Sequence, residues 1–222
     1  LNVKKAISET IMKDEQHKKW TTHVFCCAGE PCPSYFQDID DATYESIVKV
    51  NQLGSICFSN HMIQHMTTGT IQLVSSMGGQ VGVFGFSAYS PTKFALKGYA
   101  ECMHMELLHV PIYMQVAYPP DTDTPGFAKE AIGKPPETAL ISETAGLSQS
   151  HDIGRIMLQA SLYRPNTFAV NFNFDGFLLS TLTTGFGPST NVCDGVATIA
   201  FQPLVRCIAL FYLKDCHQQV LH

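Results

Sequence analysis

The sequence has few charged residues, and they form no basic region. Asp, Glu, Lys and Arg make up 15% of its 222 residues, against about 25% in an average soluble domain. Lys and Arg number 14 and Asp and Glu 19, which gives a net charge of −5. Without a basic stripe to contact phosphates, we expect no nucleic-acid partner. Hydrophobic residues reach 45%, which excludes disorder for most of the chain.

The sequence also lacks metal-binding and leader patterns. Its eight cysteines form no C-x-x-C pair with histidines at zinc spacing, so we expect reduced thiols and no metal site. No signal peptide or membrane anchor precedes Leu1, and the residues around 3–11 have the pattern of an amphipathic helix. We therefore expect the chain to begin inside a longer gene product.

Apolar runs and helical periodicity alternate along the chain. Strands are predicted at 23–27, 71–74, 113–117 and 167–172, helices at about 41–65, 89–108 and 150–162, and a long loop at about 119–147. This alternation predicts an α/β fold, a doubly wound parallel sheet with helices on both faces.

The most apolar stretch is 195–213. Gln202, Pro203 and Arg206 offset its apolar residues, so a clean membrane-spanning helix is not predicted. An interfacial, re-entrant or buried helix remains open. We divide the chain into a domain at 1–190 and an apolar, membrane-associated segment at 191–222.

Four polar residues lie where a parallel sheet places ligands. Tyr89 and Lys93 are four residues apart on one helix face, and the lysine is expected to lower the pKa of the phenol toward an acid/base range. Ser76 follows the 71–74 strand, so it is expected to meet Tyr89 beyond the carboxyl ends of the strands. Asn51 is expected to order water in the same crevice.

Short motifs around these residues resemble the short-chain dehydrogenase/reductase family. The matching segments are Cys27-Ala28-Gly29, Asn51-x-x-Gly54, Tyr89-x-x-x-Lys93 and Pro119-Pro120-x-x-x-Thr124. The block 117–127 narrows the resemblance to the branch that reduces 3-ketodihydrosphingosine. The resemblance implies a Rossmann-like fold and a catalytic set of Asn51, Ser76, Tyr89 and Lys93. It also implies that NADPH is held by Ala28, Gly29, Tyr89, Lys93, Pro119 and Thr124.

The activity that the resemblance implies is reduction of this lipid ketone to dihydrosphingosine, a step of sphingolipid synthesis. NADPH would deliver hydride to carbon while Tyr89 gives a proton to oxygen. Ser76 would position that oxygen, Lys93 would hold the nicotinamide ribose, and Asn51 would support a water relay. The resemblance further implies a membrane surface as partner, the cytosolic face of the endoplasmic reticulum membrane as location, and a homodimer through helices 41–65 and 89–108.

The sequence departs from the family at two places. The family's first strand and its T-G-x-x-x-G-x-G loop have no counterpart here, so the fold is expected to be N-terminally truncated and the choice between NADP and NAD stays open. Cys26 stands where the family usually has Asn. Two alternatives therefore remain: a catalytically silent product that keeps only lipid, membrane or partner binding, and a reductase for another hydrophobic ketone such as a steroid or retinoid.

Overall fold

The centre of the molecule is a parallel, four-stranded sheet. The computed structural model describes residues 22–183 and 192–221, and within them the sheet has the order β1-β2-β3-β6. Its strands are β1 (His23–Cys26), β2 (Gly69–Val74), β3 (Ile112–Ala117) and β6 (Ala169–Val170). All four predicted strands are present, although β6 is shorter than expected. The helix expected near residues 3–11 lies outside the described residues.

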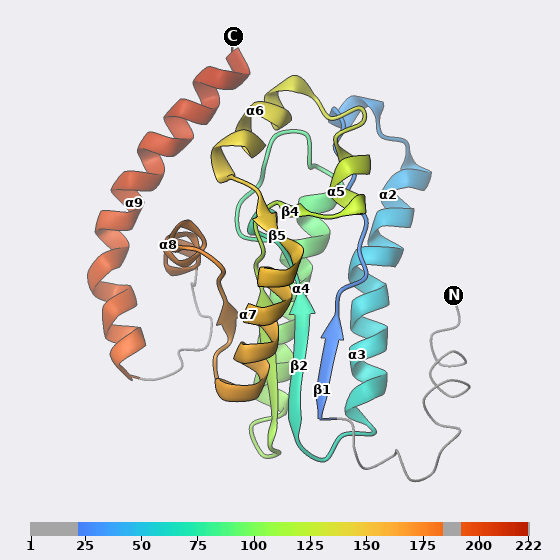
Figure 1. Ribbon diagram of the computed structural model, residues 1–222, viewed down its shortest axis with the longest axis vertical. Helices are drawn as coiled ribbons and strands as arrows, with labels where there is room; N and C mark the ends of the chain where they lie inside the picture. The colour runs from blue at the N-terminus through green and yellow to red at the C-terminus, as the bar shows by residue number, and fades with distance from the viewer. Residues whose placement is uncertain (1–21, 184–191, 222) are drawn as a thin grey trace.

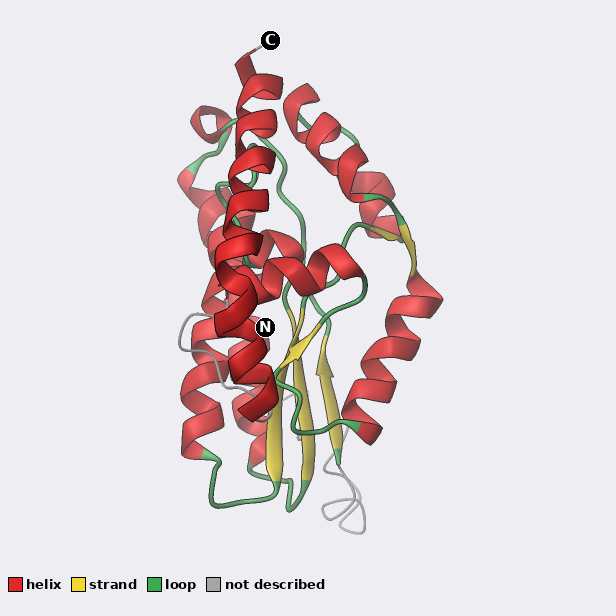
Figure 2. Ribbon diagram, turned by 90° about the vertical axis from the view of Figure 1, so that its left-hand side faces the viewer, coloured by secondary structure: helices red, strands yellow, loops and turns green. Residues whose placement is uncertain are grey.

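Helices connect the strands and cover both faces of the sheet (Figures 1 and 2). Parallel strands need such crossovers, because each strand must start again at the same end of the sheet. On one face lie a helical stretch from β1 to β2 and helix α4, and on the other lies α7. Their bounds are α2 (Asp41–Ile47), the π-helical turn η3 (Val48–Gly54), α3 (Ser55–Ile63), α4 (Tyr89–Glu106) and α7 (Ser150–Tyr163). The predicted α/β architecture is confirmed.

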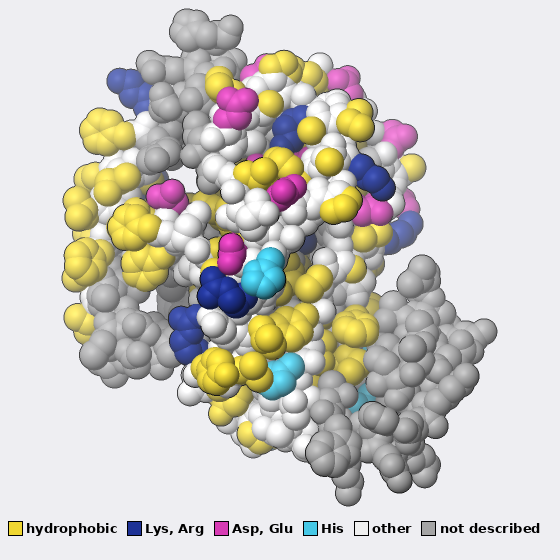
Figure 3. Space-filling model, viewed as in Figure 1, with side chains coloured by type: hydrophobic (Ala, Val, Ile, Leu, Met, Phe, Trp, Pro, Cys, Tyr) yellow, Lys and Arg dark blue, Asp and Glu magenta, His cyan; other side chains and the backbone are white. Residues whose placement is uncertain are grey.

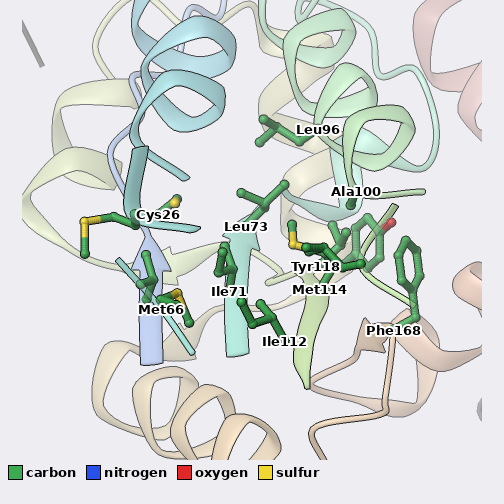
Figure 4. Packing of buried hydrophobic residues seen from close by; sticks show 14 residues of the cluster. Cys26, Met66, Ile71, Leu73, Leu96, Ala100, Ile112, Met114, Tyr118 and Phe168 are labelled. Atoms are coloured by element: carbon green, nitrogen blue, oxygen red, sulfur yellow. The ribbon is translucent and has the colours of Figure 1, made fainter. Parts of the chain in front are cut away.

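Alternating side chains of the strands supply a separate core for each face. Ile71 and Leu73 of β2 are fully buried against Leu96 of α4 (Figure 4). Gln72 lies between them in sequence and faces α7, where its amide donates to the backbone carbonyl of Met157 at 3.3 Å. Successive side chains of a strand point to opposite faces of the sheet, and this alternation determines which residues of β2 contact the helices on each face.

The segment 119–147, expected to be a loop, is largely helical, so that prediction was wrong. It contains β4 (Thr122–Asp123), α5 (Pro125–Glu130) and α6 (Pro136–Ala145), and β5 (Ser148–Gln149) follows. Strands β4 and β5 form a second, two-stranded parallel sheet. Thr124 caps α5 by accepting a hydrogen bond from the Phe127 N–H, and Pro125 starts the helix. These are the residue types that favour helix N-termini.

The C-terminal part contains two helices, α8 (Phe174–Thr183) and α9 (Val192–Leu221). Figure 3 shows apolar side chains along the outer side of α9, where Ile199, Phe201 and Phe211 are more than half exposed. Among the described residues, no helix combines the length and hydropathy that a membrane span requires. Two short 3-10 turns, η2 (Phe36–Asp38) and η4 (Met77–Gly79), complete the described elements.

Candidate active site

The first turn of α4 carries Tyr89 and Lys93 to the carboxyl end of β2. Lys93 is 4% exposed, and its Nζ donates to the carbonyl oxygen of Val74, the last residue of β2, at 2.9 Å. The same Nζ lies 5.5 Å from the centroid of the Tyr89 ring. The predicted pairing of phenol and ammonium on one helix face is therefore present in the structure.

Ser76 meets Tyr89, as the order of the elements predicted. Ser76 caps the short turn η4, and its Oγ accepts a hydrogen bond from the Gly78 N–H at 3.1 Å. A side-chain hydrogen bond also links Ser76 and Tyr89. A Cβ placed on Gly78 would lie 3.6 Å from Ser76 Oγ and 3.8 Å from Tyr89 Cε1. Ser76 and Tyr89 thus lie together beside Gly78.

Asn51 is fully buried within the π-helical turn η3. Its Oδ1 accepts from the Glu30 N–H at 2.7 Å, and its Nδ2 donates to the Glu30 carbonyl at 2.9 Å. Nδ2 also lies 3.3 Å from Thr92 Oγ1 on α4. The amide therefore fixes the chain that follows β1 against α4, and the water relay expected of Asn51 remains a prediction.

Ala28 and Gly29 are exposed in the turn after β1, beside the lysine. A Cβ on Gly29 would lie 3.1 Å from Lys93 Nζ and 3.4 Å from Asn51 Oδ1. Gly29 has no side chain, so the space beside the Lys93 ammonium is not filled from this turn. The structure thus places Gly29 beside Lys93, whereas the cofactor contacts expected of Ala28, Gly29 and Lys93 remain predictions.

Pro119 and Thr124 lie in the chain that follows β3. The Pro119 carbonyl accepts a hydrogen bond from the Met77 N–H at 3.2 Å, which ties this chain to the turn beside Ser76. The hydroxyl of Thr124 is occupied by its capping bond to Phe127. Pro119 is thus joined to the site, whereas the cofactor contact expected of Thr124 remains a prediction.

Burial dominates the protonation of Tyr89 and Lys93. It raises the pKa of Tyr89 to about 12, and the hydrogen bond with Ser76 offsets only part of this rise. The expectation of a lowered Tyr89 pKa was therefore wrong, because removal from water disfavours the charged phenolate. Burial also lowers the pKa of Lys93 to about 8. At neutral pH the phenol is protonated and able to donate a proton.

The sequence reasoning missed a group of charged residues beside Tyr89. Asp121 and Glu130 both act on the phenol, since their negative charges raise its pKa further. Lys134 Nζ lies 2.7 Å from Glu130 Oε1, and these two side chains are only 6% and 13% exposed. The i,i+4 spacing of Glu130 and Lys134 was a visible signal.

Aromatic rings join this charged group to Tyr89. The Phe86 ring packs against Tyr89 with centroids 5.3 Å apart. Lys134 Nζ lies 5.9 Å from the Phe86 centroid and 5.0 Å from that of Phe127. The segment from α5 to α6 is therefore anchored next to Tyr89.

Cys26, which stands where the family usually has Asn, belongs to the hydrophobic core. It is 5% exposed and packs in the cluster under α3 and α4 (Figure 4). Burial raises the pKa of its thiol to about 12, so it stays neutral. The substitution therefore adds an apolar contact at this position.

Comparison with known proteins places this geometry in a family. A family model described as short chain dehydrogenase matches residues 6–134. The chain is 42% identical over 209 residues to a 3-dehydrosphinganine reductase of Danio rerio. It is 40% identical over 209 residues to a 3-ketodihydrosphingosine reductase of Bos taurus. Each alignment covers 92% of this chain and 62% of the relative, so the chain spans less than two thirds of their length.

Solved structures share the fold at low sequence identity. The angucycline C-6 ketoreductase LanV with bound NADP is similar with a TM-score of 0.61 and 14% identity, over 77% of this chain and 67% of that one. A 4-hydroxyisoleucine dehydrogenase complexed with NADH and succinate gives a TM-score of 0.60 and 17% identity, over 77% and 75%. At such identity the likeness shows the fold alone.

Proposed function

Since the chain belongs to the short-chain dehydrogenase family, we propose that it reduces 3-ketodihydrosphingosine to dihydrosphingosine with NADPH. The observation that carries the proposal is the meeting of Ser76, Tyr89 and Lys93 at the carboxyl end of β2. The names of the relatives that are 40–42% identical support the substrate.

The cofactor would lie beside Gly29, where no side chain fills the space next to Lys93. Ala28 and Gly29 would lie along the nicotinamide ribose, with Lys93 Nζ donating to its hydroxyl groups. NADPH, when bound, supplies the hydride that is added to the carbonyl carbon. Asn51 supports this arrangement, because its two hydrogen bonds to Glu30 hold the chain after β1 in place.

The protein's own part in the reaction is proton delivery and positioning. Ser76 Oγ would donate to the substrate carbonyl oxygen and polarise the C=O bond. Tyr89, protonated at neutral pH, would transfer its proton to that oxygen as negative charge develops there. The Lys93 ammonium, charged below about pH 8, stabilises the phenolate that remains. The products are the alcohol and the oxidised nucleotide.

The proposed site of action is the cytosolic face of the endoplasmic reticulum membrane. The substrate is a lipid, and α9 carries a row of exposed apolar side chains that suits an interface with lipid. Vesicle flotation tests this proposal: alanine at Phe201, Leu204 and Phe211 should release the protein from anionic vesicles, and unchanged flotation would contradict it.

We also propose a homodimer through the helical stretch α2–α3 and helix α4. Leu53 and Phe94 are 45% and 41% exposed, although they lie in the two helical regions that flank the site. Analytical ultracentrifugation should give a dimer for the chain and a monomer for Phe94→Glu. A monomeric parent chain would refute this assembly.

NADPH oxidation in the presence of 3-ketodihydrosphingosine is the direct test of activity. We expect turnover that Tyr89→Phe reduces by at least about a hundredfold, because the phenyl ring keeps the packing but has no proton to give. Tyr99→Phe is the matched control: Tyr99 lies on the same helix, with its hydroxyl bound to Ser59 at 3.2 Å. Absence of turnover in a folded sample would refute the proposal and favour a catalytically silent protein that only binds lipid, membrane or a partner. A panel of steroid and retinoid ketones tests the alternative of a reductase for another hydrophobic ketone.

A further inference from the structure

Thr92 lies on α4 between Tyr89 and Lys93 and carries a buried hydroxyl group. Its side chain is 1% exposed. The hydroxyl oxygen, Oγ1, donates a hydrogen bond to the Tyr89 carbonyl oxygen at 2.7 Å. The same Oγ1 lies 3.3 Å from Nδ2 of Asn51, which is fully buried in η3. Thr92 therefore contacts both the backbone of the proposed proton donor and the amide that holds the chain after β1.

The direction of these hydrogen bonds follows from the groups that meet. A carbonyl oxygen can only accept, so the Thr92 hydroxyl uses its one proton on Tyr89. The hydroxyl then accepts from Asn51, whose Nδ2 faces Thr92 and also donates to the Glu30 carbonyl at 2.9 Å. Asn51 Oδ1 accepts from the Glu30 N–H at 2.7 Å. A directed chain of hydrogen bonds thus runs from the Glu30 N–H through Asn51 and Thr92 to Tyr89.

The start of α4 depends on this chain because its N-cap residue supplies no side-chain cap. The N-cap is Ala88, which cannot accept from the free N–H groups of the first turn. Tyr89 is the first residue of the helix, and helix ends fray. Helix α4 packs against η3, where the buried bonds of Thr92 and Asn51 do not compete with water. These bonds therefore fix the turn that carries Tyr89.

We propose that Thr92 is a positioning residue, which holds the Tyr89 backbone in place relative to the turn after β1, where the cofactor would lie. Proton and hydride are added to the oxygen and carbon of one carbonyl group, so the proton donor and the cofactor must keep a fixed separation. A displacement of about 1 Å in such an arrangement can lower the rate by about a hundredfold. This inference rests on the proposed function and adds a residue to the predicted set of Asn51, Ser76, Tyr89 and Lys93.

Steady-state kinetics of Thr92→Val test the inference, since valine keeps nearly the shape of threonine and removes the hydroxyl group. We expect kcat for 3-ketodihydrosphingosine to fall at least about tenfold, with KM for the ketone within about twofold of the parent value. Thr92→Ser restores the hydroxyl and should recover kcat to within about threefold. Thr181→Val is the matched control and should leave kcat unchanged, because the buried Thr181 makes a similar bond on α8, from Oγ1 to the Phe177 carbonyl at 2.9 Å.

Hydrogen exchange followed by mass spectrometry measures the order of the helix start without turnover. In the absence of ketone and NADPH, the amides of residues 93–97 should exchange at least about threefold faster in Thr92→Val than in the parent chain, which is the effect of one lost hydrogen bond. Thr92→Ser and Thr181→Val should leave these exchange rates unchanged.

Three results would overturn the inference: full activity of Thr92→Val, a low kcat that Thr92→Ser does not recover, or unchanged exchange at 93–97. A parent chain that oxidises no NADPH with the ketone refutes the proposed reductase instead. In that case the exchange comparison decides alone: faster exchange in Thr92→Val supports the positioning of Tyr89 by Thr92, and unchanged exchange overturns it.

Discussion

The buried ammonium group of Lys93 should lower the free energy of unfolding of the protein. The side chain is 4% exposed, and among residues 22–183 and 192–221 its one hydrogen-bond partner is the carbonyl of Val74. Burial lowers its pKa from 10.5 to about 8, and no carboxylate contributes to that shift. Replacement of Lys93 by Met keeps the length of the side chain and removes the buried charge. We therefore expect Lys93→Met to be more stable and inactive.

The size of the effect follows from the pKa of Lys93 in the folded and unfolded chain. A fall from 10.5 to about 8 corresponds to a penalty of about 3 kcal/mol on the charged form at pH 7. Loss of the hydrogen bond to Val74 offsets about 1 kcal/mol. The net gain in the free energy of unfolding is then about 2 kcal/mol at pH 7.

The gain should depend on pH in one direction. Below about pH 8 the lysine is charged in both the folded and the unfolded chain, so the penalty is fully present. Between about pH 8 and 10.5 the folded protein releases the proton first and the penalty declines. At pH 10 the difference between Lys93→Met and the parent chain should therefore shrink to within about 1 kcal/mol.

Urea unfolding followed by circular dichroism at pH 7 and pH 10 measures both quantities. Lys49→Met is the control, because Lys49 is exposed in an ion pair with Glu45 and its loss should change stability far less. A Lys93→Met variant that is less stable than the parent chain at pH 7 would refute the reasoning. So would a gain that does not depend on pH.

Two further substitutions test the proposed cofactor contact at Gly29 and the hydrophobic core. Gly29→Val should weaken NADPH binding by about tenfold while the melting temperature stays close to that of the parent chain. The new side chain would crowd Lys93 Nζ, 3.1 Å from the Cβ position, at an exposed turn; unchanged affinity in a fluorescence titration would contradict the placement of the cofactor. Leu96→Ala should lower the free energy of unfolding by about 3 kcal/mol in urea, because Leu96 of α4 is fully buried in the core against the sheet, and a loss under about 1 kcal/mol would mean that the core collapses around the missing atoms.

The sheet and the pairing of Tyr89 with Lys93 could be predicted because their determinants are local in sequence. Short apolar runs ended by Gly, Pro or Ser marked the strands, and Tyr89 and Lys93 share a helix face through their spacing alone. The position of Ser76 followed from the rule that parallel strands end at one edge.

The protonation of Tyr89 could not be predicted in this way. A lysine one turn away suggested a lowered pKa, but the burial of the ring depends on neighbours such as Phe86, which packs against it only in the folded chain. Helix α5 was missed for a different reason. The residues Thr124 and Pro125 are good N-cap and first-turn residues, yet the segment's many Pro, Gly and Thr residues favoured a loop.

The site divides into a part fixed by the sheet and a part carried by the segment after β3. Lys93 Nζ donates to Val74, and Ser75 Oγ donates to the Lys93 carbonyl at 2.9 Å, so the end of β2 and the start of α4 hold one another. Asp121 and Glu130, in contrast, lie just before β4 and at the end of α5, in a segment outside the main sheet. Changes in that segment should therefore leave the hydrogen bonds between β2 and α4 intact. The placement of Lys93 is thus separable by mutation from that of the two carboxylates.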